Sequence, residues 1–260
     1  MLCAFVCASL GLRRCVFECI FGLYGGIMNT INKLKNYFTK GELALWLSSV
    51  TVILVSFFIF DREGYLTLIA SIIGVTALIL NAKGNPLGQL IMLAFCIIYG
   101  YISYTFAYYG EMITYMGMSA PMAVYSLYAW LKNPFKNKKT EVKINSLSKK
   151  EYVLMIAVSI LVTQIFYYIL RYFGTANLAA STVSVITSFG AAYLMARRSP
   201  LFALVYAAND VVLIVMWLMA TIEDPSYYSV IICFVVFLIN DTYSYINWLR
   251  MQKRQAAEIQ

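Results

Sequence analysis

Long apolar segments alternate with short charged ones along most of this chain. Eight such segments carry no charged residue apart from Asp210 and Asp241. Each holds about 17–25 residues, which is enough for a helix to cross a hydrocarbon core of ~30 Å. They cover residues 43–60, 64–80, 86–109, 112–131, 152–170, 172–196, 199–222 and 225–249. Because these segments lack the period-two alternation of barrel strands, they predict an all-α polytopic membrane protein with eight transmembrane helices.

The charges between these segments alternate in kind from one loop to the next. Lysine and arginine gather before the first segment, at Lys83, in the long loop 132–150, at Arg197-Arg198 and after the last segment. The intervening loops are acidic, mixed or nearly uncharged. Basic loops stay in the cytoplasm, so both termini are expected on the cytoplasmic side of the inner (plasma) membrane.

Composition supports the membrane prediction and removes two other classes of protein. The chain is 62% hydrophobic and only 12% charged, whereas soluble domains are about 25% charged. The net charge of +8 is confined to short loops and forms no continuous stripe, so we expect a lipid bilayer and not a nucleic acid as the macromolecular environment.

Residues 1–42 form an amino-terminal leader whose first part differs from the rest of the chain. Four of the six cysteines lie in residues 1–19, and Arg13 and Arg14 interrupt the apolar stretch. Residues 1–27 are either a signal or extra anchor, or the product of a start set too far upstream. In the second case Met28 is the first residue, and a basic cytoplasmic leader follows it.

Two pairs of short motifs indicate an internal duplication. Residues 81–87 (NAKGNPL) recur 114 positions later as residues 195–201 (MARRSPL), and residues 125–131 (YSLYAWL) match residues 243–249 (YSYINWL) at an offset of 118. A chance likeness of boundary residues remains an alternative, because aromatic belts favour such helix ends.

The duplication predicts two parallel three-helix repeats, the arrangement of SWEET carriers. The first repeat would cover residues 64–131 and the second residues 172–249. A cytoplasmic loop and linker helix, residues 132–171, would join them. An extra amino-terminal helix at 43–60 and a cytoplasmic tail at 250–260 complete this 3+1+3 organisation.

Two Asn-Asp pairs near the middle of the last two segments predict the functional site. A charged group at that depth costs roughly 2.5 kcal/mol or more, which makes Asp210 and Asp241 functional candidates. Tyr206 and Asn209 share a helix face with Asp210. In the last segment Asn240, Tyr243 and Asn247 share a face in the same way, at spacings of three and four residues. The candidate binding residues are Gln89, Tyr99, Tyr206, Asn209, Asp210, Trp217, Asn240, Asp241, Tyr243 and Asn247.

Amides combined with aromatic faces suit a flat, hydroxylated solute that is neutral or cationic, such as a nucleoside-like vitamin precursor. The same side chains could instead hold neighbouring helices together. The sequence has no histidine, no glycine-rich phosphate loop and no Cys/His ligand spacing. We therefore expect a transporter and not an enzyme, with no catalytic residue, metal or cofactor.

The carboxyl-terminal run 237–248 (FLINDTYSYINW), followed by basic residues 250–254, resembles the PnuC-type nicotinamide riboside transporters. The run 101–111 (YISYTFAYYGE), with Pro121 and Trp130, resembles the same family, and the likeness covers roughly residues 42–254. It implies a three-plus-one-plus-three core, homotrimers, and facilitated diffusion of an unphosphorylated vitamin precursor, which a cytoplasmic kinase then traps as its phosphate.

The seventh predicted helix departs from this family pattern. Nicotinamide riboside transporters of the family carry tryptophans ahead of the central asparagine, whereas this chain has Phe202 and Tyr206 ahead of Asn209 and no tryptophan before Trp217. Nicotinamide riboside is the first expectation. Thiamine, riboflavin or a deoxynucleoside is the alternative within the family, and a substrate-binding membrane subunit of an energised vitamin importer is the alternative outside it.

Overall fold

The computed structural model describes residues 37–105, 109–175, 177–222 and 227–259. The chain divides into two compact units, residues 1–45 and 46–260. In the first unit the Glu42 amide donates to Thr39 Oγ1 (3.2 Å) and the Thr39 amide to Glu42 Oε2 (2.7 Å), a capping box that begins a helix. Residues 1–36 lie outside the described part, and with them both expectations for the first 27 residues.

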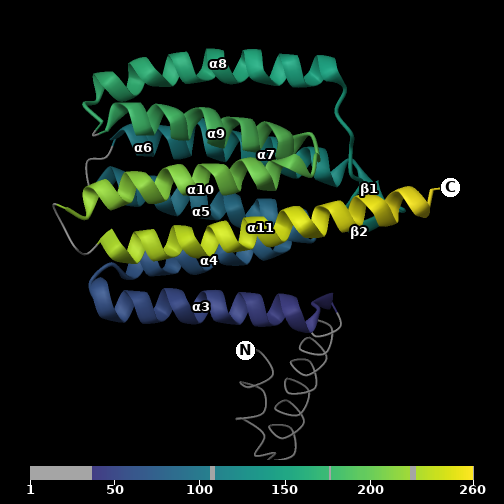
Figure 1. The fold of residues 1–260 in the computed structure, drawn as a ribbon, viewed down its shortest axis with the longest axis horizontal. Helices are drawn as coiled ribbons and strands as arrows, with labels where there is room; N and C mark the ends of the chain where they lie inside the picture. Colours follow the sequence, from purple (N-terminus) through teal and green to yellow (C-terminus); the bar gives the residue numbers. More distant parts are fainter. Residues whose placement is uncertain (1–36, 106–108, 176, 223–226, 260) are drawn as a thin grey trace, which may run out of the picture. The chain divides into compact units, whose positions relative to one another are not determined.

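The described residues form helices and one short β-hairpin (Figure 1). The elements are α3 (Lys40–Phe60), α4 (Tyr65–Ala82), α5 (Leu87–Thr105), α6 (Tyr109–Thr114), the π-helix η1 (Tyr115–Ser119), α7 (Ala120–Leu131), β1 (Pro134–Phe135), β2 (Lys138–Val142), α8 (Lys149–Tyr172), α9 (Leu178–Ala196), α10 (Leu201–Ala220) and α11 (Tyr228–Ala257). Among the described residues, seven helices are long and apolar enough to cross a membrane: α3, α4, α5, α8, α9, α10 and α11.

The predicted span 112–131 is a composite of α6, η1 and α7. Within it the Ala120 amide donates to the carbonyl of Tyr115, five residues back, which marks the π-helical turn. Each piece is shorter than a membrane span, and the eighth crossing therefore stays a prediction. Two boundaries differ most from the sequence analysis. α9 begins at Leu178, after a turn with positive φ at Gly174 and Asn177, and α11 continues beyond Leu249 to Ala257.

Six helical segments of the second unit pack in a ring. Following contacts around it, α4 packs on α5, α5 on α7, α7 on α9, α9 on α10, α10 on α11, and α11 on α4. α8 packs on α9 outside this ring, and the part of α3 in this unit is held to α4 by a hydrogen bond from Trp46 Nε1 to Thr76 Oγ1 (3.1 Å). Apolar side chains of α4, α5, α10 and α11 form the main core, which includes Val75, Phe95, Trp217 and Phe237.

The end of the ring that carries the basic loops is closed by two reciprocal contacts. Trp130 Nε1 on α7 donates to the carbonyl of Met195 on α9, and Trp248 Nε1 on α11 donates to the carbonyl of Asn81 on α4, each at 2.9 Å. The two indole rings pack against each other with centroids 5.5 Å apart, and Phe202 packs on Trp248 at 4.9 Å. Both tryptophans are fully buried, so this end has a packed aromatic core.

The hairpin β1–β2 lies in the predicted central loop and is fastened to three parts of the same end. The Val142 amide donates to the carbonyl of Gly84, and the Asn145 amide to the carbonyl of Arg198, both at 3.0 Å. Gln255 Nε2 donates to the carbonyl of Val142 (3.0 Å). This last contact gives the end of α11 a packing partner, which explains why the predicted tail continues as a helix.

Charged pairs add to this attachment. Lys136 Nζ lies 2.8 Å from Glu258 Oε2, and Arg254 pairs with Glu141. The hydrogen bond from Lys136 lowers the pKa of the exposed Glu258 carboxyl, with Arg254 acting in the same direction. These pairs are exposed, so they stabilise the hairpin only weakly.

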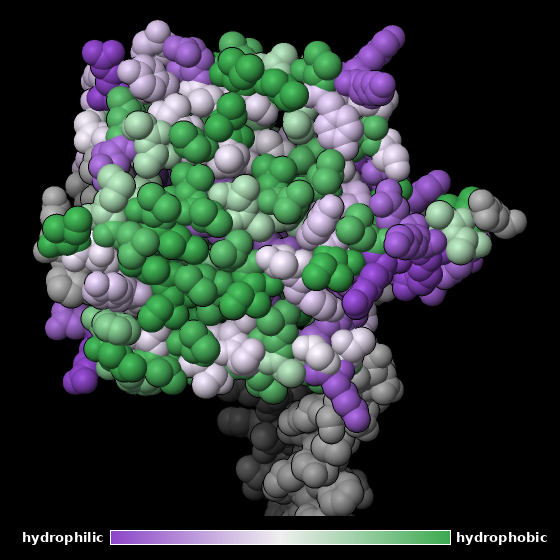
Figure 2. Space-filling view, in the orientation of Figure 1, coloured by the Kyte–Doolittle hydropathy of each residue, from purple (hydrophilic) through white to green (hydrophobic). Residues whose placement is uncertain are grey.

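Hydrophobic side chains cover the middle of the helices on the face shown in Figure 2, and hydrophilic residues gather toward the helix ends. α8 contributes several of the exposed apolar residues, among them Val153, Leu154, Ile160 and Leu161. Such a surface would be unstable in water. Together with the spans it makes the chain a multi-pass membrane protein.

Candidate functional site

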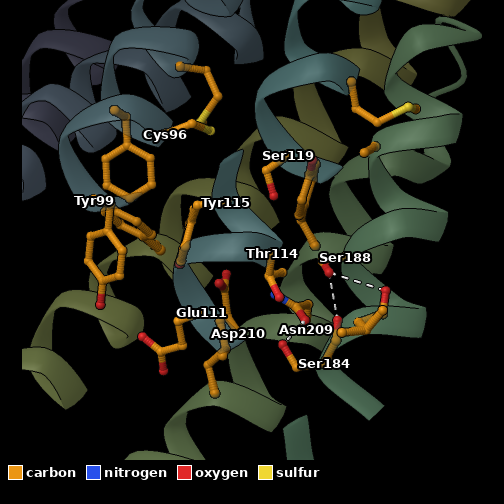
Figure 3. A pocket seen from close by; sticks show the side chains of 18 of the residues that line it. Cys96, Tyr99, Glu111, Thr114, Tyr115, Ser119, Ser184, Ser188, Asn209 and Asp210 are labelled. Atoms are coloured by element: carbon orange, nitrogen blue, oxygen red, sulfur yellow. Dashed lines mark hydrogen bonds between the residues drawn. The ribbon is translucent and has the colours of Figure 1, made fainter. Parts of the chain in front are cut away.

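A cavity of about 160 Å³ lies inside the ring of helices. α5, α9 and α10 provide much of its wall, and α4, α6, η1, α7, α8 and α11 also contribute lining residues. Figure 3 shows aromatic and carboxyl side chains on one side of the cavity and hydroxyl side chains of α9 on the other. The cavity thus combines ring surfaces, charge and hydrogen-bonding groups in one place.

The structure brings most of the sequence-predicted residues to this cavity. Those that line it are Gln89, Tyr99, Tyr206, Asn209, Asp210, Trp217 and Asp241. Asn240, Tyr243 and Asn247 are not among its lining residues. Because consecutive residues on a helix point about 100° apart, Asp241 can face the cavity while Asn240 faces another helix.

The two asparagines outside the cavity have structural partners. Asn240 Nδ2 donates to Ser49 Oγ on α3 (3.0 Å) and to the carbonyl of Val236 (2.8 Å). Asn247 Nδ2 donates to the carbonyl of Ala82 on α4 (2.8 Å). Both amides therefore link α11 to neighbouring helices.

Asn209 is anchored by the hydroxyl groups of α9. Its Oδ1 accepts hydrogen bonds from Ser184 Oγ (3.2 Å) and Thr187 Oγ1 (2.7 Å). These bonds orient the amide so that its remaining donor, Nδ2, is available to a molecule in the cavity. Asn209 can thus act as a positioned hydrogen-bond donor.

Gln89 lies at the closed end of the cavity. Its Nε2 donates to Asn81 Oδ1 (2.8 Å) and contacts the sulfur of Met195. Its Oε1 is buried and has no hydrogen-bond partner among the described residues. A buried acceptor of this kind is costly to leave unpaired, and a ligand donor or a water molecule would satisfy it.

The two aspartates meet across α10 and α11. Asp210 and Asp241 are each 4% exposed, and their carboxyl groups lie close enough to interact directly. Asp210 Oδ2 is buried without a partner among the described residues. The cavity therefore holds an acidic group whose capacity for hydrogen bonds is not exhausted by the protein.

Several lining residues were not selected from the sequence. Glu111 lies at the start of the composite span. The sequence pattern puts it in a loop between two predicted spans and therefore gives no indication that it lines the cavity. Ser181, Ser184 and Ser188 follow one face of α9 at spacings of three and four residues. That periodicity of hydroxyl groups is the sequence signal that would have found them.

Aromatic rings and Glu111 mark the way from the cavity toward the end with acidic loops. The rings of Tyr99 and Tyr115 lie 4.6 Å apart. Tyr99, Glu111 and Trp217 line both the cavity and a second space of about 650 Å³, which also reaches Asp61, Arg62 and Glu63. The site thus adjoins a vestibule in which carboxylates outnumber cations, whereas its other end is closed by the tryptophan pair.

Comparisons with known proteins agree with this architecture. The family model for the nicotinamide mononucleotide transporter matches residues 64–250. The nicotinamide riboside transporter PnuC of Neisseria mucosa is 26% identical over 219 residues, covering 83% of each chain. PnuC of Haemophilus influenzae is 23% identical over 231 residues, covering 87% of this chain and 99% of the relative.

A solved structure, described as the crystal structure of the vitamin B3 transporter PnuC, superimposes with a TM-score of 0.72. It is 26% identical and covers 84% of this chain and 94% of its own. These relatives are transporters and not enzymes. The matched span includes the whole ring of helices and the cavity, and the chain therefore belongs to the nicotinamide mononucleotide transporter family as a PnuC-type membrane transporter.

Proposed function

We propose that this protein carries unphosphorylated nicotinamide riboside across the inner membrane and binds it in the central cavity. The observation that carries the proposal is the charge of the cavity. Three carboxyl groups, those of Glu111, Asp210 and Asp241, line it together with aromatic rings, and no lysine or arginine is present among its described lining residues. Such a site favours a cationic aromatic ring.

The remaining polar groups suit the ribose. The Asn209 amide is held by two hydroxyl groups of α9 and has a donor left for a ligand. The unpaired Gln89 Oε1 supplies an acceptor near the closed end. A pyridinium ring with a hydroxylated sugar uses both kinds of group, whereas riboflavin and deoxynucleosides carry no positive charge for the carboxyls to pair with.

We further propose that transport is facilitated diffusion through two parallel repeats that rock around the cavity. Matching turns support the duplication. Gly84 and Arg198, at equivalent positions, both have positive φ, and their amides donate to the carbonyls of Asn81 and Met195, three residues back. The same two carbonyls accept the reciprocal tryptophan hydrogen bonds. In this arrangement α4, α5 and α7 correspond to α9, α10 and α11.

We also propose an orientation in the membrane, a partner kinase and an oligomeric state for this carrier. The distribution of basic loops supports a cytoplasmic location for both termini. A kinase there would trap the substrate as its phosphate and keep the inward gradient of free substrate downhill. The family resemblance supports assembly as a homotrimer, which native mass spectrometry of the purified protein would detect as three copies.

Uptake into proteoliposomes tests the function. With equal pH and salt on both sides and an empty lumen, labelled nicotinamide riboside should reach equal concentrations inside and outside. Excess unlabelled nicotinamide riboside should compete with it, and nicotinamide mononucleotide should not. Saturable transport of thiamine but not of nicotinamide riboside would replace the substrate. Binding without any flux would favour a subunit that needs an energising partner.

A further inference from the structure

The carboxyl groups of Asp210 and Asp241 cannot ionise independently of each other. The side chains come from different helices, each is 96% buried, and the two carboxyl groups line the same cavity close enough to interact directly. Two full negative charges close together in a buried site would repel strongly. Because an ionised carboxylate only accepts hydrogen bonds, a proton on one of the two carboxyl groups would replace this repulsion with a hydrogen bond between them.

Among the described residues that line the cavity, no basic side chain relieves this repulsion. The titratable groups that face the pair or share its cavity come from five elements, and all of them are neutral or anionic types: Tyr206 on α10, Cys233 on α11, Cys96 and Tyr99 on α5, Glu111 on α6 and Tyr115 on η1. The described wall offers no lysine or arginine as a counterion. A proton or a bound cation is therefore what can balance the pair.

One oxygen of the pair, Asp210 Oδ2, is available to a ligand. This atom is buried, has no hydrogen-bond partner among the described residues, and belongs to a residue that lines the cavity. Oδ2 is therefore the oxygen of the pair that remains available to a ligand in the cavity.

We propose that Asp210 and Asp241 share one proton and act together as a single monovalent anion, which pairs with a ligand of charge +1. This inference rests on the proposed function, because it specifies the charge class of the molecule bound in the same cavity. The pair would match the pyridinium ring of nicotinamide riboside and leave the occupied pair electrically neutral. An uncharged ring of the same shape would gain nothing from it.

The proposal makes a non-additive prediction for asparagine substitutions. Asparagine has the shape of a protonated aspartic acid and can donate from Nδ2 where the acid donates from its hydroxyl. Asp210→Asn or Asp241→Asn therefore leaves one carboxylate and one donor, as in the native pair. The double substitution leaves no charge.

The test is calorimetric binding of nicotinamide riboside and of its uncharged dihydro form to the purified full-length protein. Each single variant should weaken binding of the cation by less than about threefold, and the double variant by more than tenfold, which corresponds to about 1.4 kcal/mol. The uncharged dihydro form should bind all four proteins with similar affinity, which also reports that each is folded. A tenfold loss of the cation in each single variant would overturn the shared charge.

Infrared spectroscopy gives a second readout that does not depend on the double variant folding. The wild type should show a protonated-carboxyl band that disappears in each single asparagine variant and persists in Glu111→Gln, which changes a cavity carboxyl outside the pair. Persistence of the band in both single variants would refute the shared proton. Absence of nicotinamide riboside binding in the wild type would instead refute the proposed function, while the spectroscopic result for the pair would stand separately.

Discussion

Replacement of Asn209 by alanine tests the candidate site directly, because this amide is anchored on one side and faces the cavity on the other. Its loss removes a hydrogen bond to the ligand and leaves a ligand group unpaired in a buried site, which costs about 1–3 kcal/mol. That range corresponds to a Kd increase of roughly five- to 150-fold for nicotinamide riboside.

The cost to folding should be smaller. The hydroxyl of Thr187 keeps its alternative acceptors, the carbonyls of Val183 (2.9 Å) and Ser184 (3.1 Å). Hydrogen bonds between helices in membrane proteins contribute only about 0.6 kcal/mol on average. Asn209→Ala should therefore lose affinity out of proportion to any loss of stability, as measured by isothermal titration calorimetry and thermal unfolding on the same preparation.

Asn240→Ala is the matched control. Asn240 precedes the other central aspartate but donates to Ser49 and to the carbonyl of Val236, outside the cavity. This variant should unfold at a lower temperature and bind nicotinamide riboside with the wild-type Kd. The reasoning is refuted if folded Asn209→Ala keeps the wild-type Kd, or if Asn240→Ala weakens binding as much as Asn209→Ala does.

Three further predictions concern orientation, closure and packing. A reporter at the exposed Lys139 should lie in the cytoplasm, and a cysteine replacing the exposed Glu63 should react with a membrane-impermeant maleimide from outside; the opposite pattern would invert the proposed orientation. Trp130→Phe and Trp248→Phe each remove one of two equivalent hydrogen bonds. Both variants should therefore lower the free energy of unfolding by a similar amount, about 0.5–1.5 kcal/mol. A loss of stability in only one of the two variants would contradict their equivalence. Gly88→Ala should reduce the yield of folded protein, because its Cβ would lie 2.8 Å from the Asn81 backbone nitrogen, whereas Gly41→Ala, with open space around its Cβ, should give a normal yield.

The membrane-spanning helices could be predicted from the sequence because the bilayer leaves helix as the only state for a long uncharged apolar run. Their ends were harder to predict. α11 continues past Leu249 because Gln255 packs on the hairpin, a contact between residues more than a hundred positions apart. The break in the composite span depends on one π-helical turn at Tyr115–Ser119, which hydropathy does not reveal.

The residues of the candidate site also fall into those that the sequence predicts and those that it does not. Asp210 and Asp241 were identified because a charge within an apolar span is rare and costly. The sequence could not tell that Asp241 faces the cavity while Asn240 faces α3, since the direction of each side chain depends on how α11 is rotated against its neighbours. The sequence does not distinguish the serines of α9 as site residues, because small hydroxyl residues also pack well between membrane helices.

The two tryptophan hydrogen bonds join the halves of the ring in a crossed manner. Trp130 on α7 is held by the backbone of α9, and Trp248 on α11 by the backbone of α4, so a movement of one half away from the other acts on both bonds at once. A state with one bond broken would leave a buried indole N–H without an acceptor, at a cost of about 1–3 kcal/mol. Separation of the halves at this end is therefore expected to be an all-or-none event in which both bonds break together, and partly opened forms should be scarce.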